Sequence, residues 1–382
     1  MPKIVKGIRK NVNLEMKSFN GLYRRMMQPD EIIASIEEAA EHKTSRREVA
    51  GVLRKKEIRA AAIAGKIDSG RWMPPAHERS PLQEGSHRKM RKIAKPTFDD
   101  EQIVHHMLMR QLRPIMEPRF YEYTCGSIPG RGPLYAVRAI KRWRDGYKGR
   151  RFYVAELDIA KFYDNVDTEV LKGTLRRLIR DKRFLDVLER VIDAAAPGLP
   201  LGFYTSPWLG NYYLTALDRH VVHELRPDHY LRYMDNIFIF CANKRRLHAM
   251  VREIERFLRD ELHLRLNRSR QVFRFEGVSR RTGKVSGRAI NALGYVVHRD
   301  RVTLRKSILK RARAKANRMH RLHRCRRCDA AAMISYLGWL SHTDTYHYYL
   351  KYIKPKVNIQ YCKRRLSALA KRERSRNHDK LA

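Results

Sequence analysis

The chain has 382 residues, enough for two or three packed subdomains, and 43% of them are hydrophobic, which excludes a largely disordered protein. It carries 82 Lys and Arg against 40 Asp and Glu, a formal net charge of +42 at pH 7. Such an excess is typical of proteins that bind a polyanion, most often a nucleic acid through its phosphates. A membrane surface is the alternative, but no apolar run approaches the ~20 residues of a spanning helix.

The N-terminal residues MPKIVKGIRKNVNLEMKSF are basic and lack the apolar core of a signal peptide. The five cysteines, an odd number, favour a reducing compartment. We therefore expect a cytoplasmic protein that does not associate with a membrane.

Residues 1–85 are expected to form a basic helical N-terminal extension. Between residues 30 and 67 the sequence is rich in Ala, Glu, Lys and Arg, with apolar residues at helical spacing. A connector that contains Pro and Gly follows at residues 71–87. Residues 89–116 then read as a short strand that leads into a helix with an acidic first turn.

The middle of the chain alternates strands and helices. Strand-like runs occur at residues 151–163, 229–240, 262–275 and 288–297, with helical segments between them. Because neighbouring strands pair as hairpins, this order predicts an α+β fold with a sheet-and-helix core. From residue 301 to 382 the sequence is helical and very basic again, and it ends in a charged tail.

Two aspartates lie where strands are expected to end. Asp158 follows an apolar strand, where a lone Asp is usually a helix cap, and Asp235 lies with Asn236 at the tip of a hairpin. Two carboxylates at adjacent strand ends repel each other unless a divalent cation neutralises them. Mg²⁺ is commonly held by one or two carboxylates, with substrate phosphates completing its shell. Two such ions would activate an attacking 3′-hydroxyl and stabilise a leaving pyrophosphate.

Between the two aspartates, the segment GLPLGFYTSP (198–207) predicts a rigid turn before a helix. One interpretation is a plain loop in which Ser206 caps the helix and Pro207 takes its first position. The other is a backbone platform under a nucleotide and its template base. The segment alone does not distinguish them.

Taken together and in this order, LDIAKFYD (157–164), LPLGFYTSP (199–207) and YMDN (233–236) resemble the palm of a reverse transcriptase. The resemblance implies a right-hand polymerase fold, with fingers and palm at residues 86–300 and a helical thumb with a basic tail at 301–382. It implies that Asp158, Asp235 and Asn236 are catalytic and that Asp158, the carbonyl of Ile159 and Asp235 bind metal. It also implies two Mg²⁺ ions, with Mn²⁺ as a substitute, and as partners an RNA template, a primer or cDNA strand, and dNTPs.

The same resemblance assigns residues around the incoming nucleotide. Tyr163 occupies the position whose flat ring rejects a ribose 2′-hydroxyl by steric clash. Leu201 and Gly202 belong to the nucleotide platform, and Arg91 and Lys92 lie where the fingers contact the triphosphate, although a solvated basic strand is the alternative for that pair. The primer grip corresponds to the turn at Leu293, Gly294 and Tyr295.

Further segments resemble one branch of this family, the reverse transcriptases of diversity-generating retroelements. They are YTCGSIPGRGPLYAV (123–137), LRKSILKRARAKANRM (304–319) and SYLGWLSHTDTY (335–346). The likeness implies a bacterial or phage enzyme that copies a template-repeat RNA into cDNA with errors at template adenines. It also implies an accessory variability protein that is basic and oligomeric. Leu201 fits this branch, because more faithful relatives carry Gln there and an aliphatic side chain cannot hydrogen-bond to the nucleotide.

Two residues depart from the branch. Pro207 stands where the branch usually has Gln, as in intron-type enzymes, and Asn236 replaces the second Asp of Tyr-x-Asp-Asp. Asn236 removes one negative charge but keeps an oxygen acceptor, so we expect a weakened metal site and a slower enzyme. The alternatives are a retron, defence-associated or intron-type reverse transcriptase, or a catalytically weakened RNA-binding scaffold.

One further motif is Cys325-Arg-Arg-Cys328, which is half of a zinc site. His320 and His323 lie nearby and would complete a set of four ligands. A basic, solvated helix end is the simpler interpretation.

Overall fold

The computed structural model describes residues 18–75, 77, 80–84, 89–194, 197–279 and 281–381. The chain divides into two compact units. Unit 1 contains Met1–Gly132, Ala155–Ile239 and Arg245–Gln271, and unit 2 contains Pro133–Val154, Phe240–Lys244 and Val272–Ala382. None of the helices in the described part of the chain is long and apolar enough to cross a membrane.

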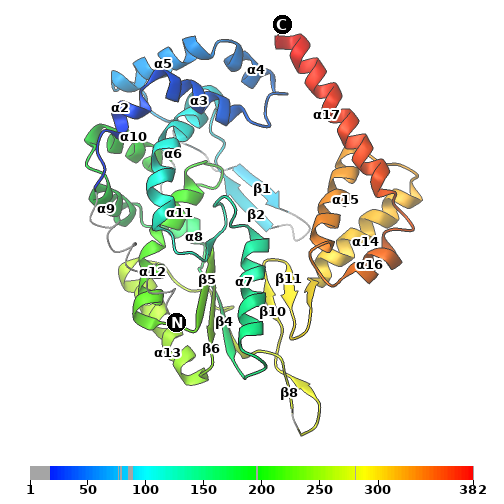
Figure 1. The fold of residues 1–382 in the computed structure, drawn as a ribbon. Coiled ribbons are helices and arrows are strands. Elements are labelled where there is room, and N and C mark those ends of the chain that lie inside the picture. The colour runs from blue at the N-terminus through cyan, green and yellow to red at the C-terminus, as the bar shows by residue number, and fades with distance from the viewer. Residues whose placement is uncertain are drawn as a thin grey trace. The chain divides into compact units, whose positions relative to one another are not determined.

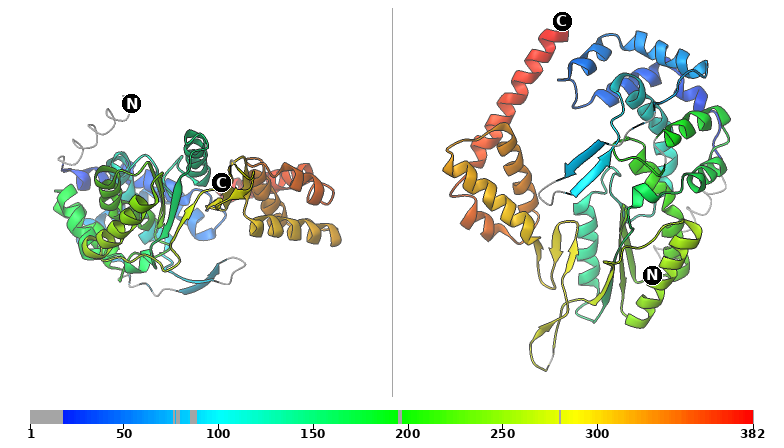
Figure 2. Two further views of the ribbon diagram at one scale, coloured as in Figure 1. Left: turned by 90° about the horizontal axis from the view of Figure 1, so that it is seen from below. Right: turned by 180° about the vertical axis from the view of Figure 1, so that it is seen from behind.

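Four helices follow one another in the described residues 18–75 of unit 1, and they lie together in each view (Figure 1 and Figure 2). They are α2 (Leu22–Met26), α3 (Pro29–Ala40), α4 (Arg47–Arg54) and α5 (Lys56–Asp68). Helix α3 begins at Pro29, whose fixed φ suits a first helical position, and Asp30 and Glu31 place negative charge at its positive end. The apolar spacing of this stretch therefore predicted helices correctly.

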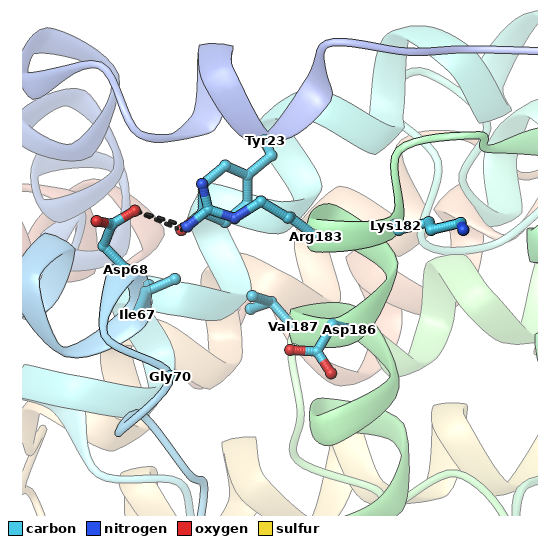
Figure 3. A pocket seen from close by; sticks show the side chains of 8 residues that line it. All are labelled: Tyr23, Ile67, Asp68, Gly70, Lys182, Arg183, Asp186 and Val187. Atoms are coloured by element: carbon cyan, nitrogen blue, oxygen red, sulfur yellow. Dashed lines mark hydrogen bonds and ion pairs between the residues drawn. The ribbon is translucent and has the colours of Figure 1, made fainter.

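A pocket of about 270 Å³ lies where α2 and α5 meet α10 (Lys182–Asp193), and Asp68, Arg183 and Tyr23 interact with one another in it (Figure 3). The guanidinium of Arg183 lies 4.1 Å from the ring centroid of Tyr23 and donates to Asp68 at 2.7 Å. The Tyr23 hydroxyl donates to the same carboxylate at 3.2 Å. Because Tyr23, Asp68 and Arg183 already bind one another, we interpret this pocket as part of the contact that fixes the N-terminal helices to α10.

After these helices, β1 (Ser80–Glu84) and β2 (Lys89–Ile93) form an antiparallel pair. The chain then enters a π-helical turn η1 (Phe98–Gln102), the helix α6 (Ile103–Met116) and a 3₁₀ turn η2 (Glu117–Arg119). The acidic first turn expected from the sequence lies in η1 rather than in a regular α-helix.

The central sheet of unit 1 has its strands in the order β3-β5-β6-β4. These strands are β3 (Thr124–Cys125), β4 (Tyr153–Asp158), β5 (His229–Tyr233) and β6 (Asn236–Cys241). β3 pairs in parallel with β5, whereas β5 and β6 form a hairpin joined by two residues. Buried aromatic and β-branched side chains, such as Tyr230, Ile237 and Phe238, explain why these runs form strands.

The remaining helices of unit 1 are α8 (Phe162–Asn165), α9 (Thr168–Leu178), α11 (Ser206–Tyr213), α12 (Thr215–Arg219), the π-helical η3 (His220–Leu225) and α13 (Lys244–Glu261). Asp167 and Asp181 cap α9 and α10, because their carboxylates accept backbone N–H groups of the first turn. Helix α13 buries one apolar stripe and exposes a charged face, which is the pattern of a helix packed on a core.

Unit 2 begins with α7 (Pro133–Gly146) and continues in short strands and four helices that gather into one group (Figure 2). The strands are β7 (Gln271–Arg274), β8 (Gly277–Val278), β9 (Val285–Ser286), β10 (Ile290–Ala292), β11 (Tyr295–Val297) and β12 (Val302–Leu304). The helices are α14 (Lys306–Arg321), α15 (Arg327–Leu340), α16 (Tyr346–Tyr352) and α17 (Ile359–Leu381). β10, β11 and β12 form an antiparallel sheet.

The fold is therefore α+β, with a mixed sheet and helices, as the sequence predicted. Two expected strands are shorter than predicted. Of residues 151–163, β4 comprises only Tyr153–Asp158, and α8 begins at Phe162. Of residues 262–275, the strand comprises only Gln271–Arg274, whereas Leu266 forms an isolated bridge with Ile159. The alternating apolar pattern at 262–266 instead fills the core under the end of β4, where Leu264 is buried.

Candidate active site

Asp158 is the last residue of β4, and a neighbouring segment holds it from two sides. The backbone N–H of Asn267 donates to the Asp158 carbonyl at 2.7 Å, and the Asn267 amide donates to Asp158 Oδ2 at 3.1 Å. These hydrogen bonds fix the backbone of Asp158 and one oxygen of its carboxylate, so the side chain keeps one orientation.

The turn of the β5–β6 hairpin consists of Met234 and Asp235, one position earlier than the Asp235–Asn236 tip predicted from the sequence, and Asn236 is the first residue of β6. Met234 has φ of 53°, in the left-handed region, which allows the two-residue connection. The N–H of Ile159, directly after Asp158, donates to the Asp235 carbonyl at 3.2 Å. Asp158 and Asp235 thus lie at neighbouring strand ends although 77 positions separate them.

The donor set at these strand ends consists of oxygen atoms, which are the ligands that Mg²⁺ accepts. Both aspartates are partly exposed, and the Asn236 amide donates to Asp235 Oδ1 at 3.2 Å. Among the described residues, no group of three or more His, Cys, Asp or Glu side chains could hold a metal ion. A cation here would therefore need backbone, water or substrate oxygens in addition to the two carboxylates.

The loop before α11 lies against the residues that follow Asp158. The N–H of Leu199 donates to the carbonyl of Tyr163 at 2.7 Å. Gly198 has φ of +73°, and a Cβ there would lie 2.4 Å from the same carbonyl. Only glycine permits this close approach, so the partly exposed Tyr163 has a fixed backbone position beside the loop.

The same loop pairs with the chain just after β2. Leu201 forms a parallel bridge with Ile93, and its carbonyl accepts the N–H of Ala94 at 2.8 Å. Gly202 has φ of +109°, and a Cβ there would lie 2.1 Å from the Ala94 carbonyl. Arg91 and Lys92 belong to β2, but their side chains lie outside the described residues. The backbone thus brings β2, the 198–202 loop and Tyr163 together within unit 1.

A buried ion pair holds the backbone of the turn between β5 and β6. Arg232 and Asp218 are almost fully buried, and the guanidinium donates to both carboxylate oxygens, at 2.7 and 2.6 Å. Arg232 also donates to the carbonyl of Met234 at 3.0 Å and to Asn211 Oδ1 at 3.0 Å. The pair therefore fixes the backbone immediately before Asp235.

Two hydroxyl groups complete this network. Tyr230 donates to Asp218 at 2.6 Å, and Thr124 donates to it at 2.8 Å. Burial, together with the charge of Asp218, raises the pKa of Tyr230 well above its ordinary value, so its hydroxyl stays protonated and donates. Burial acts against the charge of Arg232, but Asp218 raises the pKa of that guanidinium overall.

The segment predicted as a primer grip is a tight turn between β10 and β11 in unit 2. Leu293 and Gly294 have φ of 53° and 90°. A Cβ on Gly294 would lie 2.8 Å from the ring of Trp339, and the ring of Tyr295 stacks on Trp339 with centroids 4.9 Å apart. Trp339 is therefore a packing residue of unit 2 that holds this turn.

Among the described residues, the cysteines of the Cys-x-x-Cys motif do not form a metal-binding group with the nearby histidines, although Cys325 and His323 line the same small cavity. Cys328 is exposed, whereas Cys325 Sγ lies 3.8 Å from Cys362 Sγ, on α17. Burial raises the pKa of Cys362 to about 11, which disfavours the thiolate that zinc requires. Since the described residues contain no metal-binding cluster, the zinc interpretation has no support.

Asn267 and the Arg232–Asp218 pair are not among the residues predicted from the sequence. No motif or spacing in the sequence indicates Asn267, because its contact with Asp158 depends on the tertiary fold. Arg232 did carry a signal, since a cation in the apolar run YLRYM is unusual in a buried strand and requires an acidic partner.

The part of the chain that contains these site residues matches a known protein family. The family model for reverse transcriptase (RNA-dependent DNA polymerase) matches residues 82–297, more than half of the chain. The group II intron-encoded protein LtrA of Lactococcus lactis subsp. cremoris is 26% identical over 237 residues, which cover 58% of this chain and 38% of LtrA. Protein YkfC of Escherichia coli (strain K12) is 28% identical over 170 residues, 42% of this chain and 44% of YkfC. The chain thus spans less than half the length of these two relatives.

Among solved structures, a telomerase from Candida albicans in complex with a fragment of telomeric RNA shows a weak likeness. It has a TM-score of 0.44 and 12% sequence identity, and the match covers 77% of this chain and 59% of that one.

Proposed function

Because this chain belongs to the reverse transcriptase (RNA-dependent DNA polymerase) family, we propose that it copies an RNA template into DNA at the ends of β4 and β6. Members of the family use template RNA and nucleotides and typically depend on Mg²⁺. The observation that carries the proposal is the 3.2 Å hydrogen bond from Ile159 N–H to the Asp235 carbonyl, since it joins the strand ends that bear Asp158 and Asp235.

In this proposal Asp158, Asp235 and the Ile159 carbonyl are the protein's ligands for two Mg²⁺ ions, for which Mn²⁺ is a substitute. Bound Mg²⁺ supplies Lewis-acid activation of the primer 3′-hydroxyl and neutralises the leaving pyrophosphate. The role of Asn267 is to orient Asp158 through its two hydrogen bonds, and Arg232 sets the backbone that presents Asp235.

The nucleotide lies against the 198–202 loop in this account. Tyr163, whose backbone the loop fixes, rejects a ribose 2′-hydroxyl, and Leu201 and Gly202 form the platform. Arg91 and Lys92 on β2 bind the triphosphate. In unit 2, the rigid turn at Leu293–Tyr295 grips the primer backbone.

At the level of architecture, we assign a right hand to these parts. Residues 1–85 form the N-terminal extension, residues 86–300 the fingers and palm, and residues 301–382 the thumb and tail. The helices α14–α17 lie within residues 301–382, and this supports the assignment of a helical thumb.

The experiment that tests the function is primer extension. Purified protein with Mg²⁺, an annealed RNA template and DNA primer, and dNTPs should extend the primer in the order that the template dictates. Absence of templated extension with either Mg²⁺ or Mn²⁺ would favour the RNA-binding scaffold instead.

Asn236→Asp is expected to make the enzyme faster and its metal site tighter. The substitution returns a second negative charge beside Asp235 and removes an amide donor that occupies Asp235 Oδ1. Since charge count tunes cation affinity, the Mg²⁺ concentration for half-maximal extension should fall roughly tenfold. Asn243→Asp, which adds the same charge at an exposed position, is the control. Equal Mg²⁺ titrations for wild type and Asn236→Asp would refute this interpretation of the amide.

Within the family, we assign the chain to the diversity-generating branch, which pairs the polymerase with an accessory variability protein. Leu201 and the segments at 123–137, 304–319 and 335–346 support this assignment. The intron-type alternative is favoured by Pro207 and by the likeness to the group II intron-encoded protein LtrA. Sequencing of cDNA separates the two, because only the first predicts errors concentrated opposite template adenines.

Leu201→Gln is expected to reduce these errors about fivefold, because an amide can hydrogen-bond to the incoming nucleotide and one such bond contributes about 1 kcal/mol. Leu201→Met keeps an apolar side chain of similar volume and should leave the error spectrum unchanged. Error rates are read from cDNA sequences made on one defined template. If Gln and Met variants gave the same spectrum, Leu201 would not set fidelity.

A further inference from the structure

Unit 2 contains a cavity of about 1070 Å³. It is lined by the end of α7 and the loop after it, by β7, β8 and part of β9, and by Arg299. The lysine side chains of the described residues do not line it. Its cationic side chains are Arg144, Arg150, Arg151, Arg274, Arg281 and Arg299.

The floor of this arginine-lined cavity is rigid. Phe152 stacks on Tyr147, with ring centroids 4.0 Å apart, and on Phe275, with centroids 4.6 Å apart. Phe152 and Phe275 are only 3% and 4% exposed. These rings are therefore already packed against one another and offer little apolar surface to a partner.

The acidic groups of the cavity are engaged. Asp145 pairs with Arg144 at 2.7 Å. Glu276 accepts the backbone N–H of Arg299 at 3.0 Å and pairs with His298 at 3.1 Å. Neither carboxylate therefore neutralises the guanidinium groups around the rest of the cavity.

Five arginines thus surround the cavity without an ion pair to a carboxylate of the described residues; they are Arg150, Arg151, Arg274, Arg281 and Arg299. The Nε of Arg274 is also buried and has no hydrogen-bond partner among the described residues. A buried donor without an acceptor is costly, so its presence points to a ligand that brings acceptor oxygens.

We propose that this cavity binds the phosphodiester backbone of RNA, at a site that acts in anchoring rather than in catalysis. Guanidinium groups match phosphate oxygens with two parallel hydrogen bonds, and arginine alone supplies the cavity's positive charge. A protein partner would require an apolar centre in the cavity. The aromatic rings that line the cavity are buried, and Val278 is the exposed large apolar side chain among its described lining residues, so such a centre is lacking. The inference goes beyond templated synthesis, because RNA binding here needs no metal and no nucleotide.

The test compares two triple variants in binding a labelled RNA hairpin at several NaCl concentrations. The cavity triple is Arg150→Gln, Arg151→Gln and Arg281→Gln, all exposed. The matched control triple is Arg252→Gln, Arg256→Gln and Arg259→Gln, on the exposed face of α13. The cavity triple should weaken binding at least about tenfold and make the slope of log K against log salt shallower by about two to three. The control triple should change the slope by less than about one.

Arg274→Gln provides a second measurement. It should weaken hairpin binding several-fold without lowering the Tm, because the Nε has no protein partner to lose. The proposal is overturned if the two triples weaken binding equally, or if Arg274→Gln lowers only the Tm. It is also overturned if polyglutamate competes as well as RNA of equal charge, since that result would assign the cavity to an acidic protein. Primer extension at saturating template should be unchanged in the cavity triple, so failure of this site and failure of the polymerase are separate outcomes.

Discussion

Replacement of Asp158 or Asp235 by Asn is expected to reduce RNA-templated extension by at least about 10³-fold while the protein stays folded. Each substitution keeps the shape of the side chain and removes one of the two negative charges at the neighbouring strand ends. Asn267 can still donate to an amide oxygen at position 158, so the backbone should hold. The loss should therefore appear in the rate and not in the Tm.

The matched control is Asp186→Asn, an exposed carboxylate on α10 that pairs with Arg190 at 2.6 Å. It removes the same charge from a helix that carries none of the proposed site residues and should leave the extension rate within about twofold of wild type. RNA binding should be retained in all three variants, because the RNA phosphates bind to basic side chains and not to the aspartates. Extension by the Asp235→Asn protein at the wild-type rate would exclude a metal-binding role for that carboxylate.

The second large effect concerns the buried pair behind the hairpin tip. Asp218→Asn should destabilise the protein by about 3–5 kcal/mol, because it leaves the Arg232 guanidinium buried without a charged partner. The hydroxyls of Tyr230 and Thr124 lose a charged acceptor at the same time. Urea midpoints of wild type and variant measure the difference.

The double variant Arg232→Met with Asp218→Leu separates stability from positioning. Replacing both charges removes the uncompensated ion, so part of the lost stability should return. Activity should not return, because the Met234 carbonyl and Asn211 still lack their donor from Arg232. Recovery of both stability and activity would show that Arg232 does not position Asp235.

Periodicity predicted much of the fold from residues alone. The strands β4, β5 and β6 and the helices α3, α4 and α5 fall in the ranges where apolar spacing predicted them, whereas α2 lies outside the stretch with helical spacing. The shortened strand at Gln271–Arg274 shows the limit of this reasoning. Leu264 and Leu266 alternate with polar residues as a strand would, but their burial under β4 satisfies the pattern without a ladder of hydrogen bonds.

The candidate site was predictable only in part, for a similar reason. Asp158 and Asp235 follow apolar strands, so the sequence indicates that they lie at strand ends. The hydrogen bond between Ile159 and Asp235 depends on the order of strands in the sheet, which no local pattern encodes. The contact of Asn267 with Asp158 likewise depends on tertiary packing.

The role of the glycines in the 198–202 loop was partly predictable from the sequence. A Gly-Pro-rich segment predicts a turn, but both interpretations of that turn were open. The positive φ of Gly198 and Gly202, and the carbonyls against which a side chain would clash, show why these positions tolerate no Cβ.

Whether Asp158 and Asp235 bind the same cation can be measured by a titration of Mn²⁺, followed by electron paramagnetic resonance, with template, primer and a complementary dNTP bound. We expect the wild type to bind Mn²⁺ tightly, and Asp158→Asn and Asp235→Asn each to weaken the binding of the same ions. The double variant should then lose little more than either single one, because both carboxylates serve one site. Losses that simply add, or single variants that bind Mn²⁺ as the wild type does, would mean that the two aspartates do not share a cation.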